Sequence, residues 1–228
     1  MGDRQERTPL LDALTAYKNQ APAYFRIPGH RFERGISERW TKETGTGIFA
    51  YDLSEAEGLD DLHDPRGVIR EAQELAAEAF GSERAYFLVN GTTCGNEAMV
   101  LASAWEGEKI LVPRNAHKSI LMGMIMSGAV PVWMEPELLE NGLVGGISPE
   151  TAASDVYKRQ VERGLAACPE AKAVFVVSPT YYGLCSDLRA IGEICHRKGV
   201  MLLVDEAHGA HLSFSPRLPE GALWQGAD

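Results

Sequence analysis

The sequence has 228 residues, enough for one large domain or one and a half, and for a core that needs no disulfide or metal. Hydrophobic residues make up 45% and charged residues 24% of the chain, a balance that excludes intrinsic disorder and a long coiled coil. The formal net charge of −10 argues against a protein that tracks nucleic-acid phosphates, because such proteins need basic surfaces.

The first 67 residues predict one short helix followed by an arm rich in loops. Between Thr8 and Gln20, leucines and a tyrosine recur on one helical face, with Thr8 at the N-cap position and Pro9 in the first turn. From residue 21 to residue 67 no period is sustained, and glycine and proline interrupt the chain repeatedly. We therefore expect residues 1–67 to form a helix and an arm that packs on another part of the protein.

From Val68 onward, predicted helices alternate with predicted strands. The helices are expected over residues 68–80, 94–105, 117–127, 149–167 and 188–198. The strands are expected over residues 85–89, 109–112, 130–134, 173–178 and 200–204. This alternation predicts βαβ units, so residues 68–228 should form an α/β domain with a mostly parallel sheet and helices on both faces.

Two features depart from a regular domain of this kind. Residues 155–160, back-translated, match the recognition end used in transposase-based sequencing libraries, and removing residues 152–160 leaves a continuous helix start. We expect an inserted artefact there, with an ordinary solvated helical turn as the alternative. The chain also stops at Asp228 without a further helix, so we expect the domain to be incomplete at its C-terminus.

Nothing in the sequence predicts a membrane span or a signal peptide. The longest uncharged run worth testing, residues 120–134, is shorter than the ~20 apolar residues that a spanning helix needs. The N-terminus lacks the apolar segment of a signal peptide, and the four cysteines form no CxxC pair, which favours a reducing compartment. We expect a soluble cytoplasmic protein with neither a membrane nor a nucleic-acid partner.

The segment 89–96, with the sequence VNGTTCGN, predicts a strand-to-helix turn that could bind an anion. Gly91 permits a tight turn, and Thr92 and Thr93 offer hydroxyl and backbone N–H groups at a helix N-terminus, where the helix dipole favours phosphate. No lysine follows, so the segment is not the P-loop of nucleotide-binding proteins. A capped helix after a strand, with no ligand, is the alternative.

A second motif, Asp-Glu-Ala-His at residues 205–208, directly follows an apolar strand. A carboxylate at the carboxyl end of a parallel strand lies where α/β folds bind ligands, which makes Asp205 a candidate site residue. The same letters form the magnesium-binding box of helicases, but that interpretation requires an upstream P-loop lysine that the chain lacks. A metal site formed by His208 and His211 is a further alternative, although it has no evident third ligand.

A third candidate is His117, which follows the strand predicted over residues 109–112. Its imidazole could stack on a flat aromatic ligand, or it could simply form hydrogen bonds at the start of a helix. The three sites lie at the carboxyl ends of strands and together offer an anion site, a flat stacking group and a carboxylate. Pyridoxal phosphate needs these three groups, because an acid partner keeps its ring nitrogen protonated and the ring then accepts electrons.

The chain resembles the N-terminal half of the Orn/Lys/Arg decarboxylases, which are pyridoxal-phosphate enzymes. The resemblance extends over nearly the whole sequence, through ordered motifs at residues 8–14, 26–30, 58–63, 87–93, 178–183 and 205–211. It implies the large domain of the type I pyridoxal-phosphate transferase fold, the fold of aspartate aminotransferase. It also implies a small amino-acid substrate, and a homodimer or higher homo-oligomer whose active sites form between subunits.

The resemblance assigns roles to the matching positions. Thr92, Thr93 and the backbone at Cys94 would hold the cofactor phosphate. His117 would stack on the pyridine ring, and Asp205 would pair with the ring nitrogen as a catalytic residue. Two further assignments are His208, a second catalytic residue beside the cofactor and near the substrate carboxylate or the Schiff base, and Thr180, for the ring hydroxyl.

One element of the family pattern is absent from these residues. The family's Schiff-base lysine lies in a Ser-x-His-Lys motif, and no lysine of this sequence has that context, Lys118 beside His117 included. The resemblance therefore implies decarboxylation of arginine, lysine or ornithine by the whole protein and an inactive fragment here. The alternatives are another pyridoxal-phosphate enzyme of this fold, such as an aldolase or aminotransferase, and a non-catalytic module that keeps the fold.

Overall fold

The computed structural model of the chain describes residues 3–32, 34–136 and 154–228. Its contacts divide the chain into two compact units, residues 1–87 and residues 88–228. The helix over residues 68–80 belongs to the first unit by this criterion, whereas the sequence analysis assigned it to the large domain. The division of the whole protein into domains at residues 67 and 68 stays a prediction.

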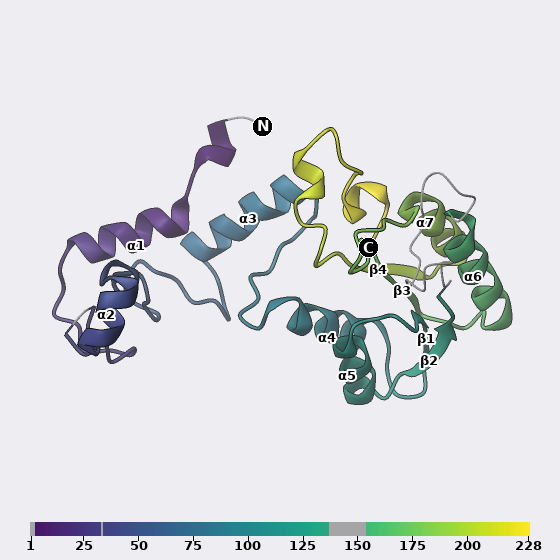
Figure 1. Cartoon of the computed structure of the whole chain (residues 1–228), viewed down its shortest axis with the longest axis horizontal. Coiled ribbons are helices and arrows are strands. Elements are labelled where there is room, and N and C mark those ends of the chain that lie inside the picture. The colour runs from purple at the N-terminus through teal and green to yellow at the C-terminus, as the bar shows by residue number, and fades with distance from the viewer. Residues whose placement is uncertain (1–2, 33, 137–153) are drawn as a thin grey trace. The chain divides into compact units, whose positions relative to one another are not determined.

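The N-terminal unit consists of helices joined by irregular segments (Figure 1). Its helices are η1 (Asp3–Glu6), α1 (Pro9–Asn19), α2 (Glu38–Thr44), η2 (Gly47–Ala50) and α3 (Val68–Phe80). The helix predicted after Thr8 is confirmed as α1, which packs against α3. Helix α2 was not predicted: Ser37 caps it by accepting a hydrogen bond from the backbone N–H of Trp40 at 3.3 Å.

The C-terminal unit contains a sheet between helices. Its helices are α4 (Gly91–Ser103), α5 (Lys118–Ser127), α6 (Ser154–Ala167) and α7 (Leu188–Arg197), followed by η3 (Leu212–Phe214) and η4 (Ala222–Gln225). Its strands are β1 (Lys109–Pro113), β2 (Val130–Met134), β3 (Ala173–Val177) and β4 (Met201–Asp205). Across the parts of the chain that are described, no helix has both the length and the apolar character needed to cross a bilayer.

The four strands are all parallel and lie in the order β2-β1-β3-β4. The predicted α/β fold with a parallel sheet is therefore confirmed. From β1 the chain first moves to β2 on one side, and it then returns to add β3 and β4 on the other side. The strand order thus reverses between β1 and β3, which is the place where open α/β sheets form a ligand-binding crevice.

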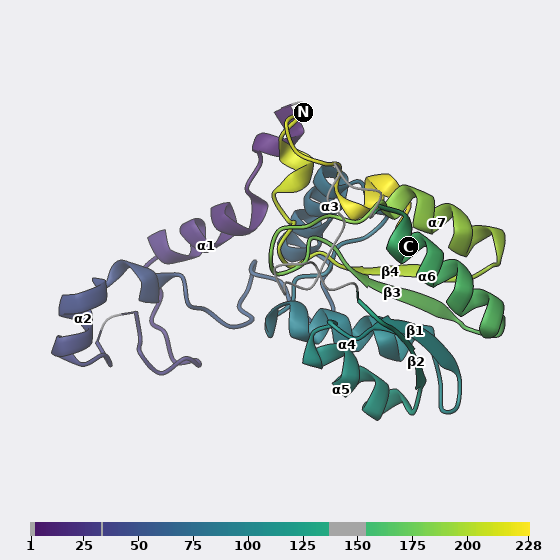
Figure 2. The same cartoon turned by 45° about the vertical axis from the view of Figure 1, so that its right-hand side comes forward.

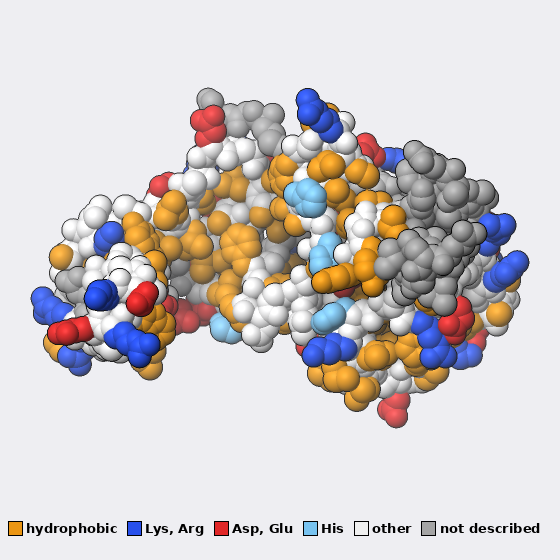
Figure 3. All heavy atoms as spheres, in the orientation of Figure 1, with side chains coloured by type: hydrophobic (Ala, Val, Ile, Leu, Met, Phe, Trp, Pro, Cys, Tyr) orange, Lys and Arg blue, Asp and Glu red, His pale blue; other side chains and the backbone are white. Residues whose placement is uncertain are grey.

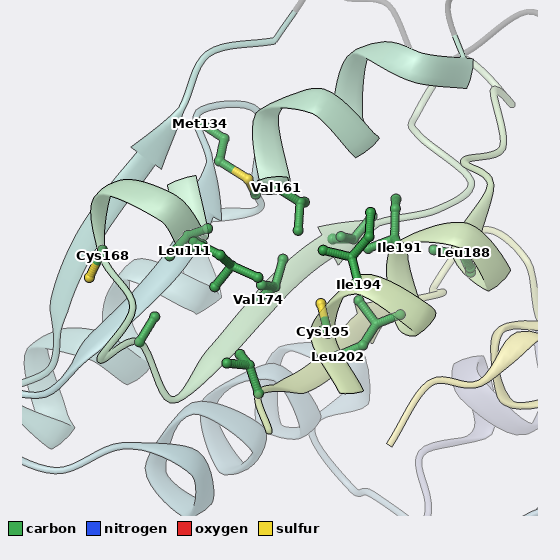
Figure 4. Packing of buried hydrophobic residues seen from close by; sticks show 14 of the residues in the cluster. Leu111, Met134, Val161, Cys168, Val174, Leu188, Ile191, Ile194, Cys195 and Leu202 are labelled. Carbon is green, nitrogen blue, oxygen red and sulfur yellow. The ribbon is translucent and has the colours of Figure 1, made fainter. Parts of the chain in front are cut away.

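Helices cover both faces of the sheet, and Figure 2 shows α4 and α5 on one side and α6 and α7 on the other. The alternation of side chains along each strand supplies both cores. Leu111 and Val174 face the core formed with α6 and α7, whereas Ile110 and Phe175 face the core formed with α4 and α5. Figure 4 shows the first of these cores, in which Ile191 of α7 lies among aliphatic side chains from the strands and α6.

One predicted strand is wrong. Residues 85–89 form an irregular segment, although their run of apolar side chains is typical of a strand. A strand needs a neighbour to take its backbone hydrogen bonds, and this segment leaves Tyr86 and Val89 exposed. The other predicted elements recur with shifts of a few residues at their ends. The predicted helix start at residue 149 lies outside the described residues, and the proposed insertion at residues 152–160 stays a prediction.

Candidate active site

A pocket of about 350 Å³ opens at the carboxyl ends of β1, β3 and β4, at the reversal in strand order. Residues from four different connections line it: Asn90, Gly91, Thr92, Thr93, Asn96, Asn115, His117, Val177, Tyr181, Asp205, Ala207 and His208. Its volume is in the range of small-molecule sites, and its position is the one expected for a doubly wound sheet. The pocket is therefore the candidate active site.

The first side of the pocket is the N-terminus of α4. The helix begins at Gly91, whose φ of +63° suits glycine, and the side chain of the preceding Asn90 forms no capping hydrogen bond. The first backbone N–H groups of a helix have no partner within the helix, so they can donate to an anion. Thr92 and Thr93 are exposed there and add two hydroxyl groups.

The second side is the carboxylate of Asp205, the last residue of β4. It is only 5% exposed. One oxygen, Oδ1, accepts a hydrogen bond from the backbone N–H of Ala207 at 3.1 Å, and Oδ2 accepts one from Nδ2 of Asn96 at 2.9 Å. A carboxylate has about four acceptor sites, so Asp205 can still accept a hydrogen bond from a ligand.

Two histidines complete the pocket. His117 is the N-cap of α5, and its Nδ1 lies 2.8 Å from Oγ of Ser119. His208 packs edge-on against Tyr181, with ring centroids 5.7 Å apart. Both histidines are exposed, and Figure 3 shows histidine side chains reaching the molecular surface. Their imidazoles can therefore contact a ligand that enters the pocket.

Of the site residues predicted from the sequence, the structure brings Thr92, Thr93, His117, Asp205 and His208 into one pocket. Cys94 and Thr180 are not among the lining residues. Thr180 is 3% exposed, and its hydroxyl oxygen accepts a hydrogen bond from the backbone N–H of Leu184 at 3.3 Å. In this structure Thr180 therefore stabilises its own turn.

The sequence analysis missed Asn96, Asn115 and Tyr181 as lining residues. For Asn96 a signal was present. It shares the buried stripe of α4 with Val100 and Ser103, at helical spacing. A buried side-chain amide on the helix face that packs against the sheet needs a hydrogen-bond partner. A carboxylate at the end of a neighbouring strand is one such partner, so this requirement could have pointed to Asp205.

Glu206 fixes the segment that carries His208. Its Oε1 accepts a hydrogen bond from the backbone N–H of Ala222 at 2.9 Å, which joins the end of β4 to the start of η4. Burial raises the pKa of the Glu206 carboxyl, and the hydrogen bond from Ala222 only partly opposes that effect. Gly209 lies so close that an added Cβ would meet the side chains of Pro179 and Glu206 at 2.5 and 2.7 Å.

The pocket fits pyridoxal phosphate by the chemistry of its donors and acceptors. The helix N-terminus suits the phosphate, and Asp205 suits a protonated ring nitrogen. His117, in the connection between β1 and α5, supplies a flat imidazole in the same pocket. The carbonyl oxygen Oδ1 of Asn96, a lining residue, is buried and has no hydrogen-bond partner among the described residues.

Two other polar sites occur in the N-terminal unit. A cavity of about 370 Å³ is lined by residues that include Arg70, Glu74 and Arg84. Its charges are already engaged in part, since Arg70 donates to Glu74 at 3.0 Å. Ligand atoms of Glu55, Asp61 and His63 lie within 4.8 Å of one another, but they are largely exposed, and exposed acidic clusters commonly hold no ion.

Comparisons with known proteins give a consistent result. The family model for the major domain of the Orn/Lys/Arg decarboxylases matches residues 8–228. An arginine decarboxylase of Halalkalibacterium halodurans is 43% identical over 226 residues, which are 99% of this chain and 44% of that protein. An arginine decarboxylase of Bacillus subtilis is 42% identical over 225 residues, 98% of this chain and 44% of that protein.

Among solved structures, lysine decarboxylase A from Pseudomonas aeruginosa superposes with a TM-score of 0.81 and 29% identity. The match includes 96% of this chain and 30% of that one. The present chain therefore spans less than half the length of the curated relatives that it matches.

Proposed function

The chain belongs to the Orn/Lys/Arg decarboxylase family, and from that premise we propose that residues 88–228 form the cofactor-binding part of a pyridoxal-phosphate-dependent decarboxylase of a basic amino acid. One observation carries the proposal. A helix N-terminus, an imidazole and a buried carboxylate, from connections far apart in the sequence, line one pocket at the strand reversal.

Each group has a distinct role in the proposal. Thr92, Thr93 and the backbone N–H groups of α4, that of Cys94 included, bind the phosphate. His117 contacts the face of the ring, and the carboxylate of Asp205 holds a proton on the ring nitrogen. Pyridoxal phosphate, when bound, supplies an acceptor for the electrons released when the substrate loses carbon dioxide. Thr180 does not line the pocket, so the pocket does not support its predicted contact with the ring hydroxyl.

His208 also lines this pocket, and its ring packs edge-on against that of Tyr181. We assign it to the substrate side, next to the carboxylate that leaves. In the overall reaction the carboxylate carbon departs as carbon dioxide and the α-carbon takes up a proton. A positively charged or hydrogen-bonding imidazole beside the substrate can orient the carboxylate for that step.

Arginine is the first substrate to test. The curated relatives at 42% and 43% identity are named arginine decarboxylases, whereas the solved relative at 29% identity is named a lysine decarboxylase. Since the chain spans only part of those relatives, substrate choice belongs to the whole protein. The homo-oligomeric state and the cytoplasmic location also remain predictions about the whole protein.

The 228 residues by themselves are proposed to bind the cofactor without turnover. No lysine is among the described residues that line the pocket, and the sequence contains no Ser-x-His-Lys motif. In the whole protein a lysine amine would hold the cofactor covalently, and the described lining of the pocket provides none. Activity is therefore expected from the full-length protein that contains this segment, and not from the segment alone.

The test is a decarboxylation assay of that full-length protein with arginine, lysine and ornithine. Release of carbon dioxide with one equivalent of the matching amine is expected, fastest with arginine. Asp205→Asn should lower kcat by about a thousandfold or more, because a lost charge partner at the reacting ring costs several kcal/mol. A keto-acid product without carbon dioxide would instead indicate an aminotransferase, and near-normal decarboxylation by the variant would contradict the role of Asp205.

A further inference from the structure

A chain of hydrogen bonds connects the two groups that the proposed function assigns to the face and to the nitrogen of the cofactor ring. Nδ2 of Asn96 lies 2.9 Å from Oδ2 of Asp205 and 2.9 Å from Oγ of Ser119. The same Oγ lies 2.8 Å from Nδ1 of His117. Asn96 and Ser119 are each 1% exposed, so water does not compete for these bonds.

The orientation of the Asn96 amide follows from its neighbours. An amide nitrogen has two hydrogens, and the two acceptors at 2.9 Å use both of them. The reverse orientation would place the amide carbonyl against the carboxylate of Asp205, where two acceptors would face each other. Asn96 therefore donates in both directions, and its Oδ1 is left buried without a partner among the described residues.

The direction of the bond between Ser119 and His117 follows from the donors around Nδ1 of His117. Oγ of Ser119 accepts from Asn96 and can donate its own hydrogen to that Nδ1. The backbone N–H of Ser119 also donates to that Nδ1, at 3.3 Å. With two donors directed at it, Nδ1 acts as an acceptor and carries no proton. The proton of the neutral imidazole is then on Nε2.

We propose that Asn96 and Ser119 are positioning residues, which hold the Asp205 carboxylate in place and keep the neutral His117 ring protonated on Nε2. The inference rests on the proposed function, because only a ligand between Asp205 and His117 makes their joint orientation useful. Neither residue needs to touch the cofactor. They act through their partners, in the way that outer hydrogen bonds orient the ligands of a metal.

The first experiment measures the tautomer directly. In the 228-residue chain labelled with ¹⁵N-histidine, long-range ¹H–¹⁵N spectra at about pH 8.5, where an ordinary imidazole is neutral, report which ring nitrogen carries the proton. His117→Gln assigns the signal. The Nε2–H form is expected for His117 in the wild type, and Ser119→Ala should give a mixture of both forms.

Ser127→Ala is the matched control, because it removes a hydroxyl from the same helix, where that hydroxyl bonds only to local backbone. It should leave the His117 signals unchanged. An Nδ1–H form in the wild type, or identical spectra for wild type and Ser119→Ala, would overturn the proposal. This readout needs no cofactor, so it is independent of the proposed function.

The second experiment measures coupling between Asn96 and Asp205 through ligand affinity. Pyridoxamine phosphate is the probe, because it carries the ring and the phosphate but cannot react with surface lysines. Asn96→Ala should raise its Kd by about tenfold or more, the usual effect of losing a hydrogen bond to a charged group. In an Asp205→Ala background the same change should alter Kd less than about twofold, because its target is gone.

Ser103→Ala is the control for Asn96→Ala, since it removes a buried polar group from the same helix that bonds only to Val100. A wild-type chain that fails to bind the probe would count against the proposed function, and the tautomer spectra would still test the positioning pair. A chain that binds, with Asn96→Ala no weaker than Ser103→Ala or with the same loss in both backgrounds, would overturn the further inference alone. If circular dichroism shows that Asn96→Ala is unfolded, the decision passes to the tautomer of Ser119→Ala.

Discussion

Asp60 shows how a single carboxylate can organise a segment that has no regular structure. It adopts a φ of +70° and accepts five backbone hydrogen bonds of 2.7–3.4 Å, from Asp61, Arg66, Gly67, Ile69 and Arg70. The last of these donors belong to the first turn of α3, whose N-cap position is a glycine without a side chain. Asp60 thus caps α3 from a distance in sequence, where the helix dipole also favours a negative charge.

These hydrogen bonds lower the pKa of the Asp60 carboxyl, because they stabilise its charged form. Desolvation alone would raise the pKa of the Asp60 carboxyl, but the backbone N–H groups of Arg66, Gly67, Asp61 and Arg70 together lower the pKa to about 2. The folded state therefore binds a proton less readily than the unfolded state, where the pKa is near 3.8. The stabilisation is complete above that value and is lost as the pH falls through about 2.

We expect Asp60→Asn to lower the free energy of unfolding by about 1–3 kcal/mol at pH 7, because asparagine tolerates the positive φ but replaces one acceptor oxygen by a donor. The measurement is urea denaturation of both proteins at pH 7, 5, 4 and 3. The difference between them should shrink between pH 5 and pH 3, as protons begin to occupy Asp60 preferentially in the unfolded state. A difference that stays constant over this range would mean that the carboxylate charge is not responsible.

Asp64→Asn is the matched control for this prediction. Asp64 lies in the same irregular segment, and among the described residues its carboxylate pairs only with Arg66, at the surface. Exposed pairs contribute little to stability, so this change should have an effect within about 0.5 kcal/mol.

At the residue scale, the sequence predicts the groups that stand next to strand ends and misses those that act from inside helices. Asp205 ends β4 and His117 lies in the connection after β1, so their convergence could be expected from the α/β pattern. The threonines of α4 were predicted from a strand-to-helix turn, and they reach the pocket although the strand before them does not form. Asn96 and Ser119 lie within helices, and their pairing joins positions 23 residues apart. That contact depends on how α4 packs beside α5, which no local pattern contains.

At the scale of elements, apolar runs between turn residues predict β1, β2, β3 and β4 to within two residues. The same signal predicts a strand at residues 85–89, where none forms. An apolar run specifies burial or pairing but not which neighbour provides it. Capping, in contrast, is specified locally. His117 and Asp187 begin α5 and α7 by accepting hydrogen bonds from backbone N–H groups two or three residues later.

The contact between α4 and α5 depends on a glycine. A Cβ at Gly123 of α5 would lie 2.9 Å from Cβ of Val100 and 3.2 Å from Cα of Glu97, both on α4. Real side chains do not approach so closely, so any larger residue must separate the two helices. Because α4 carries both the predicted phosphate site and Asn96, a shift of this helix would also disturb the pocket.

We expect Gly123→Ala to lower the melting temperature by about 2–6 °C, since overpacking costs about 1–3 kcal/mol and the gain in helix propensity offsets less than that. It should also weaken binding of pyridoxamine phosphate. Gly47→Ala makes the same chemical change where nothing lies within 4 Å of the added Cβ, and it should leave both quantities nearly unchanged. An unchanged melting temperature for Gly123→Ala would mean that α4 and α5 can separate at little cost.

At the scale of the whole molecule, the sequence predicts the class of sheet but not the order of its strands. Helix and strand alternation would be the same for the order β1-β2-β3-β4, which has no reversal. The observed order β2-β1-β3-β4 puts α5 on one face and α6 and α7 on the other, and it opens the crevice between β1 and β3. Here the strand order emerges from packing of the two cores, which involves residues far apart in the chain.

The same topology predicts a difference between two ligands that share a ring. If the phosphate binds at the N-terminus of α4 while the ring nitrogen faces Asp205, pyridoxamine phosphate should use both ends of the pocket and pyridoxamine only one. At a concentration of about 100 times its Kd, a ligand that binds only the folded state stabilises it by about 2.7 kcal/mol, which raises the melting temperature of a chain of this size by about 5–10 °C.

We expect that shift for pyridoxamine phosphate in a thermal melt of the 228-residue chain. At equal concentration, pyridoxamine should give a small fraction of it, and inorganic phosphate alone should compete with the phosphorylated ligand. Equal shifts from pyridoxamine and its phosphate would show that the anion site at α4 does not take part in binding, even if the carboxylate of Asp205 does.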